Sequence, residues 1–249
     1  MLPSADPGVV TPFHLRLMRI VREAGEAHGV ENLRLDGETA LAAFYLRHRE
    51  SEDLDFFCDP PFNAAAFGED VQRLARAAGV EITSMGRGNL GISRLMAHNP
   101  EQPGQQVKID LVLQSPSRLE PLVTTADGIR IPSYRDICAG KLHALCDRFE
   151  ERDFIDFHVI LNRPVGGEPV DDDGICARFE AHLRDLMEHD PGIDPPYFGQ
   201  RIMPGLGREI VSAFQLRLLV PVEESALQHT LDLCINQCAK RTHQAAPSD

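Results

Sequence analysis

Three aspartates carry the strongest chemical signal in this chain of 249 residues. Asp53 and Asp55 lie two positions apart in DLDFFC (residues 53–58), an aromatic-rich segment that predicts a strand. Side chains at positions i and i+2 of a strand project from the same face, so both carboxylates are expected on one side of a sheet. Adjacent carboxylates repel each other unless cations lie between them, and oxygen ligands of this kind favour Mg²⁺.

A third aspartate fits the same site. Asp110 lies within the apolar segment QVKIDLVL (residues 106–113), which predicts a strand, and an unpaired carboxylate is costly to bury there. If the two strands are neighbours, Asp53, Asp55 and Asp110 form a site for two Mg²⁺ ions, which at about 3.5–4 Å apart promote in-line phosphoryl displacement. The alternative is an exposed strand end, with Asp110 paired to Lys108 on its own strand face.

A glycine turn before the first of these strands offers contacts for phosphate. Residues 36–39 (DGET) follow a short predicted strand and open a predicted helix. The backbone N–H of Gly37 and the hydroxyl of Thr39 are therefore candidate phosphate donors. The alternative is an ordinary helix N-cap provided by Asp36 or Thr39.

Positive charge is scarce in the chain. Lys and Arg number 25 against 38 Asp and Glu, a net charge of −13, which argues against a broad nucleic-acid-binding surface but allows a focused basic site. Arg47, His48 and Arg49 could form such a site as a positive rim beside the aspartates. The alternative is a solvated helix end that the helix dipole favours.

The elements that must position these residues divide the chain in two, into a mixed α/β region over residues 1–131 and a helical region over residues 132–249. Helices are predicted over residues 11–28, 38–46, 63–78, 133–148, 151–162, 174–188, 207–219 and 222–239, with Gly/Pro-rich stretches at 163–169 and 190–207. Strands are predicted over residues 32–35, 53–58, 80–85, 90–96, 106–113 and 129–131.

The composition indicates a folded protein of the cytoplasm. Hydrophobic residues make up 43% of the chain, enough for a sizeable core. No apolar run approaches the roughly 20 residues of a membrane span, and no signal peptide is evident at the N-terminus. Six cysteines without a C-x-x-C pair indicate free thiols in a reducing compartment.

Three segments in order resemble the AbiEii/AbiGii-type nucleotidyltransferases. LDGETALAAFYLRHRESEDLDFF (residues 35–57) is similar to that family's G-G-T-A-L stretch followed by H-R-x-S-x-D-x-D-F-F. KIDLV (residues 108–112) resembles the strand that carries the third acid. SYRDICAGKLHALCDRFEERDFIDFHVIL (residues 133–161) resembles the family's helical segment with its Lys and its R-D-x-x-D cluster.

The resemblance implies an α+β protein with a DNA-polymerase-β-like nucleotidyltransferase core (a mixed sheet with flanking helices), followed by a helical region that contributes to the active cleft. It implies Mg²⁺-dependent transfer of a nucleoside monophosphate from an NTP to an acceptor hydroxyl, on an RNA or tRNA 3′ end, a protein or a small molecule. Several members of that family are toxins of toxin–antitoxin pairs, so a cognate antitoxin is a further expected partner.

The resemblance also assigns roles to the residues of the first region. Asp53 and Asp55 match the metal ligands, and Asp110 matches the third acid, which orients or deprotonates the acceptor hydroxyl. Ser51 matches a Ser expected near the phosphates. Glu38 stands where the family usually has a small residue, and its carboxylate would repel phosphates unless it turns away or meets a metal. This departure favours an alternative, a degenerate fold that binds a nucleotide or partner without chemistry; a minor alternative is a phosphoesterase.

In the helical region, Lys141 matches the family's Lys that meets the triphosphate, and its otherwise apolar helix agrees with a role facing a cleft rather than solvent. Asp153 matches the first Asp of R-D-x-x-D and is expected toward the cleft as a catalytic residue. Asp156 matches the second, and its spacing predicts an i,i+4 pair with Arg152 on the helix surface.

Overall fold

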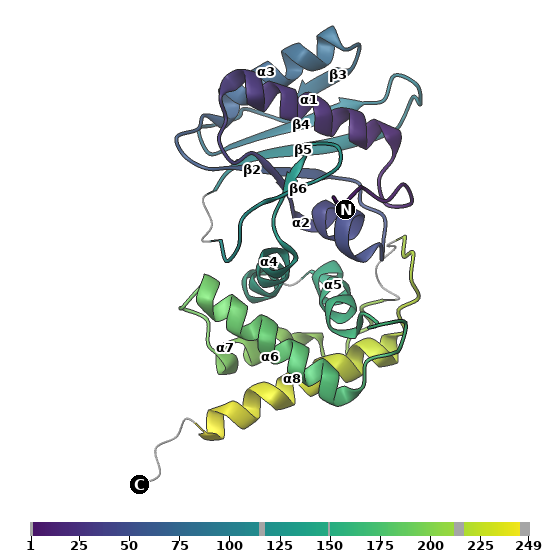
Figure 1. The fold of residues 1–249 in the computed structure, drawn as a ribbon, viewed down its shortest axis with the longest axis vertical. Helices are drawn as coiled ribbons and strands as arrows, with labels where there is room; N and C mark the ends of the chain where they lie inside the picture. Colours follow the sequence, from purple (N-terminus) through teal and green to yellow (C-terminus); the bar gives the residue numbers. More distant parts are fainter. Residues whose placement is uncertain (1, 115–117, 149, 212–216, 245–249) are drawn as a thin grey trace. The chain divides into compact units, whose positions relative to one another are not determined.

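The chain forms two compact units in the computed structural model, which describes residues 2–114, 118–148, 150–211 and 217–244 (Figure 1). The N-terminal unit is Met1–Ser133 and the C-terminal unit is Tyr134–Asp249, so the division falls two residues after the boundary expected near residue 131. None of the described helices combines the length and apolarity that crossing a lipid bilayer requires.

A five-stranded mixed sheet in the order β1-β2-β5-β4-β3 is the centre of the N-terminal unit. The β2–β5 pair is parallel and the other pairs are antiparallel. The mixed sheet with flanking helices is therefore confirmed. The strands are β1 (Arg34–Asp36), β2 (Leu54–Cys58), β3 (Glu81–Ser84), β4 (Ile92–His98) and β5 (Gln106–Leu113), and a separate pair joins β6 (Val123–Thr124) to β7 (Arg130–Ile131).

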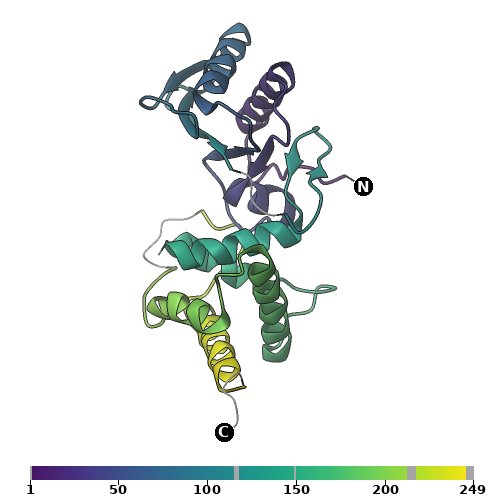
Figure 2. The same ribbon diagram turned by 90° about the vertical axis from the view of Figure 1, so that its left-hand side faces the viewer.

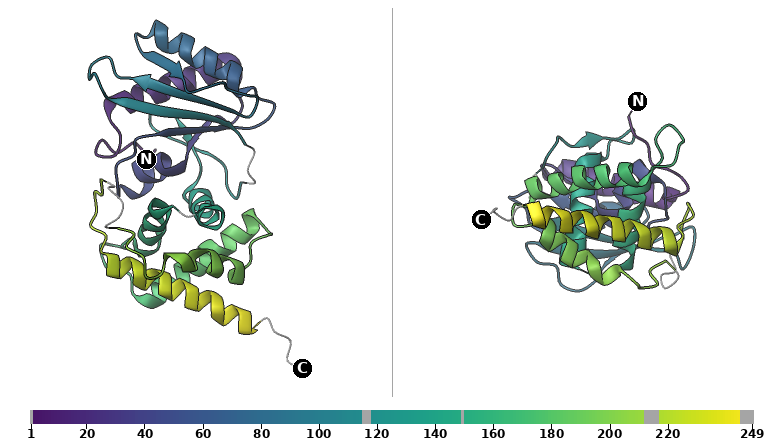
Figure 3. Two further views of the ribbon diagram at one scale, coloured as in Figure 1. Left: turned by 180° about the vertical axis from the view of Figure 1, so that it is seen from behind. Right: turned by 90° about the horizontal axis from the view of Figure 1, so that it is seen from below.

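Two helices, α1 (Pro12–His28) and α3 (Ala64–Ala77), cover one face of this sheet (Figures 1 and 3). Alternate residues of the strands turn toward these helices, and the central ones, Phe56 and Ile109, are completely or almost completely buried. The residues between them face the other way. Strand alternation thus separates an apolar core from an opposite face that carries the polar side chains of β2 and β5.

The predicted helix over residues 38–46 is present as two joined pieces. The α-helix α2 (Gly37–Leu41) continues into one turn of π-helix, η1 (Ala42–Leu46). The side chain of Asp36 accepts a hydrogen bond from Gly37 N at 2.7 Å, so the N-cap alternative holds for Asp36. Arg47, in the left-handed conformation at φ 55°, ends the segment.

The described part of the C-terminal unit is helical, as predicted (Figure 2). Its core includes three mutually packed rings, Phe157, Phe179 and Phe198, with centroids 5.6–6.1 Å apart. The helices are α4 (Tyr134–Asp147), α5 (Glu151–Asn162), α6 (Asp172–His189), α7 (Pro195–Ile202) and α8 (Glu224–Gln244), with a 3₁₀ turn η2 (Met203–Gly205).

The structure corrects two predictions in this unit. Helix α7 lies within residues 190–207, which were predicted to separate helices; Asp194 caps it by accepting from Tyr197 N at 2.8 Å. The predicted helix over 207–219 is wrong for residues 207–211 and 217–219, while 212–216 lie outside the described residues. There Gly207 N and Val211 N donate to side chains of α8 instead of to helical carbonyls.

Candidate active site

A row of charged side chains crosses four strands of the sheet, on the face opposite α1 and α3. In the parallel β2–β5 pair, Asp55 lies directly beside Asp110. Asp36 of β1 is the partner of Asp55 on its other side, and Arg94 of β4 is the partner of Asp110. The predicted adjacency of the two aspartate-bearing strands is therefore confirmed, with three carboxylates in consecutive positions across the sheet.

The two central carboxylates are short of compensating charge. Burial raises the pKa of Asp55 from 3.8 to about 6, and the neighbouring carboxylate of Asp110 adds to this rise. Asp110 is 9% exposed, and its buried Oδ1 has no hydrogen-bond partner among the described residues. A buried carboxylate oxygen that lacks a hydrogen-bond partner is suited to bind a cation.

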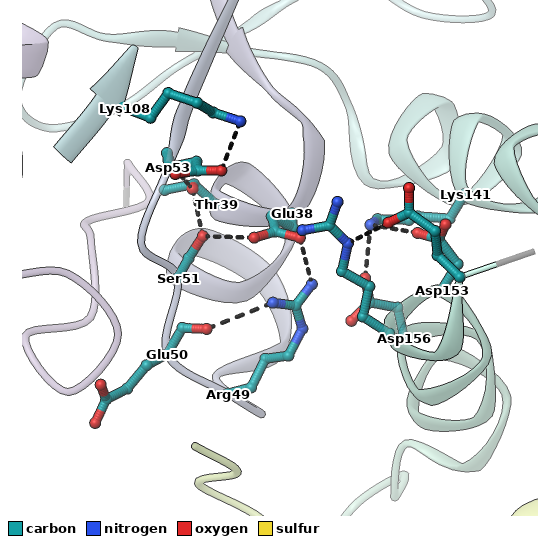
Figure 4. A network of polar contacts seen from close by, with 12 residues as sticks. Glu38, Thr39, Arg49, Glu50, Ser51, Asp53, Lys108, Lys141, Asp153 and Asp156 are labelled. Carbon is teal, nitrogen blue, oxygen red and sulfur yellow. Dashed lines mark hydrogen bonds and ion pairs between the residues drawn. The ribbon is translucent and has the colours of Figure 1, made fainter. Parts of the chain in front are cut away.

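Two basic side chains approach the row without satisfying it. Lys108 Nζ lies 2.8 Å from Asp53 Oδ2 (Figure 4). The same atom lies 3.9 Å from Asp110 Oδ2. Arg94 Nε lies 3.6 Å from Asp110 Oδ2. The expected alternative of a Lys108–Asp110 pair is thus present only at long range, because Lys108 is closer to Asp53. Asp53 itself precedes β2, which begins at Leu54.

Gly37 lies directly against one of these carboxylates. Its φ of +68° is in the left-handed region, and a Cβ atom there would lie 2.9 Å from Asp55 Oδ2. Any side chain at this position would therefore be strained and would crowd the carboxylate. The glycine turn predicted from the sequence keeps the backbone of α2 close to Asp55.

Two buried hydroxyls fix the segment that carries Asp53. Thr39 Oγ1 lies 2.6 Å from Ser51 Oγ and also donates to the backbone carbonyl of Asp53. Ser51 Oγ donates to Glu38 Oε1 at 3.4 Å (Figure 4). The hydroxyls expected near phosphates therefore connect α2 to the approach to β2.

Glu38 is paired with a buried arginine. Arg49 Nη2 donates to Glu38 Oε2 at 3.0 Å, and the arginine is only 1% exposed. His48 is also buried, while the exposed Arg47 pairs with Asp6 at 3.2 Å. The alternative of a solvated helix end is thus wrong for His48 and Arg49, and the positive rim beside the aspartates stays a prediction. The carboxylate of Glu38, which motivated the degenerate alternative, therefore has a basic partner in the folded protein.

The oxygen donors of the row fit a divalent cation, although they are not arranged as a finished site. Among the residues that the structure describes, no three His, Cys, Asp or Glu side chains form a group ready to hold a metal. Lys108 supplies positive charge beside Asp53 and Asp110 instead. The unpartnered Asp110 oxygen and the destabilised charge of Asp55 nevertheless provide the hard oxygen ligands that Mg²⁺ requires.

The C-terminal unit has its own buried ion cluster between α4 and α5. Lys141 Nζ lies 2.6 Å from Asp156 Oδ2 and 3.3 Å from Asp153 Oδ1 (Figure 4). Arg148 reaches both oxygens of Asp153, at 2.9 and 3.4 Å. Both aspartates are 0% exposed, so this cluster joins the two helices through charges removed from water.

The family model described as "Nucleotidyl transferase AbiEii toxin, Type IV TA system" matches residues 19–232 of the chain. The chain belongs to the AbiEii nucleotidyltransferase family. It is therefore a nucleotidyltransferase of a toxin–antitoxin class, as its sequence motifs predicted. A search of curated proteins found no match.

Solved structures show the same fold as this AbiEii protein. MenT4, a nucleotidyltransferase toxin from Mycobacterium tuberculosis, gives a TM-score of 0.52 at 17% identity, covering 93% of this chain and 89% of its own. JHP933 from Helicobacter pylori gives 0.50 at 21% identity, covering 95% of this chain and 97% of its own. Each of these two similarities covers more than nine-tenths of this chain, so the shared fold includes both units.

The geometry of the AbiEii motifs corrects two sequence-based interpretations in the helical region. Asp156 is buried against Lys141, so the predicted surface pair with Arg152 is wrong; Arg152 Nε instead lies 2.6 Å from Glu150. Lys141 does not extend to solvent, which removes the alternative of a snorkelling side chain.

Two charged residues of these clusters were missed in the sequence. Arg94 lies in a predicted strand, but only the β4–β5 register shows that it faces Asp110. Arg148 lies at the end of the predicted helix 133–148, five residues before Asp153, a separation that by itself predicts no contact. Their basic side chains were the only sequence signal.

Proposed function

We propose that this nucleotidyltransferase uses Asp53, Asp55 and Asp110 to bind two Mg²⁺ ions and to transfer a nucleoside monophosphate from an NTP to an acceptor hydroxyl. The observation that carries the proposal is the direct β2–β5 pairing of Asp55 with Asp110, whose Oδ1 lacks a partner among the described residues. The adjacent carboxylates of Asp55 and Asp110 repel each other, and their arrangement becomes favourable when it binds divalent cations.

Each acid has a distinct role in this proposal. Asp53 and Asp55 hold the metal, which when bound neutralises the triphosphate and stabilises the pyrophosphate leaving group. Asp110 also contributes an oxygen, and it orients the acceptor hydroxyl or accepts its proton. The raised pKa of Asp55 supports its role as a metal ligand, because a nearby cation stabilises the charged form of that carboxylate.

We propose further that Gly37, Thr39, Arg49 and Ser51 bind the phosphates. Gly37 brings the backbone of α2 close to Asp55, and the Ser51 hydroxyl and the Arg49 guanidinium already contact a carboxylate, the group that most resembles a phosphate. The proposed roles of Lys141 in triphosphate binding and of Asp153 in catalysis rest on the family resemblance, since the two side chains are paired with each other inside the C-terminal unit.

The biological role that we propose is that of a toxin with a cognate antitoxin. The family to which the chain belongs is described as a toxin of a type IV toxin–antitoxin system. The acceptor is an RNA or tRNA 3′ end, a protein or a small molecule. A net charge of −13 favours an acceptor bound through a limited contact area instead of a long stretch of phosphates.

The test is a labelling experiment with each α-labelled NTP, Mg²⁺, and total cellular RNA and protein. We expect one fraction to become labelled by the parent protein, at least 100-fold less by Asp55→Asn, and not at all in EDTA. Asp127→Asn, which removes the same charge elsewhere in the N-terminal unit, should label like the parent. Transfer by Asp55→Asn at the parent rate would show the two-metal proposal to be wrong, and free NMP or phosphate would indicate a phosphoesterase.

A further inference from the structure

An open pocket of about 460 Å³ lies within the C-terminal unit, away from the ion cluster of Lys141. It is lined by the start of α4 at Tyr134, by Ile160 of α5 and the loop that follows it, and by Arg178 and His182 of α6. This volume is in the range of sites that hold small organic ligands. None of the residues to which the proposed transfer reaction assigns a role lines this pocket.

The pocket is basic in an acidic protein. Its polar lining includes Arg163, Arg178 and His182 and contains no Asp or Glu, although acidic residues outnumber basic ones by 13 in the chain. No ion pair of Arg163 or Arg178 with a carboxylate is found among the described residues. Two arginines without a carboxylate partner and facing one pocket are suited to bind an anion.

The arginines are held in place by groups other than carboxylates. Arg178 Nη1 donates to the carbonyls of Leu161 and Arg163 at 3.0 and 2.5 Å, at the end of α5. Arg163 lies over the ring of Tyr134, with its Cζ 5.7 Å from the ring centroid. The guanidinium groups are therefore positioned by the fold before any ligand arrives, which lowers the entropic cost of binding.

A histidine and an apolar wall complete the lining. The buried Nδ1 of His182 has no hydrogen-bond partner among the described residues, and burial lowers the pKa of this side chain. Its ring lies edge-on to Tyr134, with centroids 6.3 Å apart. Val165 adds apolar surface and is 68% exposed, whereas Ile160 is only 1% exposed. An apolar surface beside a cationic one suits a ligand that carries both a ring and an anion.

We propose that this pocket, defined by Tyr134, Arg163, Arg178 and His182, is a second nucleotide-binding site that receives a phosphate on its arginines and a base against Tyr134 and Val165. Arg163 and Arg178 donate to the phosphate oxygens. His182 Nδ1 provides a further polar contact to the sugar or the base. The phosphate belongs to a free mononucleotide or to the terminal nucleotide of an RNA strand, and the site needs no metal.

The experiment is isothermal titration calorimetry on the full chain in EDTA, so that metal-dependent binding at the aspartates does not contribute. The probes are AMP, UMP, inorganic phosphate, and an RNA trinucleotide with and without a 5′ phosphate. The test variant is Arg163→Gln, because the side chain of Arg163 is exposed and, unlike that of Arg178, donates no hydrogen bond to the described carbonyls at the end of α5. The matched control is Arg184→Gln, which removes the same charge from an exposed position of α6 outside the pocket.

We expect AMP or UMP to bind the parent, with affinity about tenfold weaker in Arg163→Gln and unchanged in Arg184→Gln. Tighter binding of the 5′-phosphorylated trinucleotide than of AMP identifies an RNA end as the source of the phosphate, and the reverse order identifies a free nucleotide. The proposal is overturned if no nucleotide binds at millimolar concentration, if both variants behave alike, or if inorganic phosphate binds as tightly as AMP.

Discussion

Glu38 places a carboxylate against the side chains that the proposed function assigns to phosphate binding. Its two oxygens contact Arg49 and Ser51, and it is among the charges that raise the pKa of Asp55. A carboxylate and a phosphate oxygen compete for the same donors. An incoming NTP must therefore displace Glu38 or bind beside a like charge, and this residue limits nucleotide affinity in either case.

Replacing Glu38 by Gln should tighten NTP binding about fivefold, because it removes a like charge close to the triphosphate but keeps an oxygen for Arg49. Calorimetry with Mg²⁺ and each NTP measures the change. Glu31→Gln removes the same charge from an exposed position of the N-terminal unit and should leave the affinity as it was. Weaker binding in Glu38→Gln would mean that this carboxylate helps to hold the nucleotide or its metal.

Strand alternation predicts that Asp55 and Asp110 each lie on the polar face of their strands, and the family resemblance adds that these strands form one site. The contacts that the individual charged side chains make could not be predicted from the sequence. Arg94 faces Asp110 only through the antiparallel register of β4 and β5, and Arg49 is buried and paired with Glu38. Such contacts depend on tertiary packing that no local spacing encodes.

At the level of elements, the sequence predicted the boundaries best where the hydrophobic pattern and the flanking Gly and Pro residues indicated the same ends. The prediction for β5 matches the structure at both ends, because polar and apolar residues alternate from Gln106 to Leu111 and the apolar run continues to Leu113. Helix α7 was missed because its flanking glycine and prolines indicate a break, although Pro195 is the favourable first residue of the helix and Asp194 is its cap. The conformation of residues 207–211 depends on side chains of α8, which lie too far along the chain for a local pattern to detect.

The packing of α4 on α5 yields a prediction about Lys141. Lys141→Met should lower the free energy of unfolding by about 3 kcal/mol or more, because it leaves Asp156 charged and buried without its 2.6 Å partner. Lys141→Met combined with Asp156→Leu should recover most of this loss, since the pair is then replaced by apolar groups. Urea denaturation followed by circular dichroism measures both changes.

Lys240→Met supplies the control for that pair of variants, because Lys240 is exposed on α8 and its loss should change stability by less than about 0.5 kcal/mol. Unchanged stability in Lys141→Met would contradict a structural role for the ion cluster. That result would instead favour the proposed role of Lys141 in triphosphate binding.

At the scale of the whole molecule, an excess of negative charge opposes compactness at neutral pH. The chain carries a net charge of −13 with its ten histidines neutral, so mild acidification relieves self-repulsion and favours the folded state. A buried histidine acts in the opposite direction. Burial lowers the pKa of His158 from 6.5 to about 4, and its Nδ1 lies 2.9 Å from Thr230 Oγ1, between α5 and α8.

His158 predicts that part of the stability is lost as the pH falls. The unfolded chain binds a proton at this residue near pH 6.5 and the folded chain only near pH 4, so its contribution is complete above pH 6.5 and decreases as the pH falls toward 4. Between pH 7 and pH 5 the loss should be about 2 kcal/mol. His158→Gln cannot take up a proton, so its free energy of unfolding should decrease by about 2 kcal/mol less than that of the parent over this interval.

Urea denaturation of both proteins at pH 7 and pH 5 measures this difference. The relief of self-repulsion cancels from the difference because both chains share the remaining charges. Equal changes in the two proteins would mean that His158 titrates alike in the folded and unfolded states.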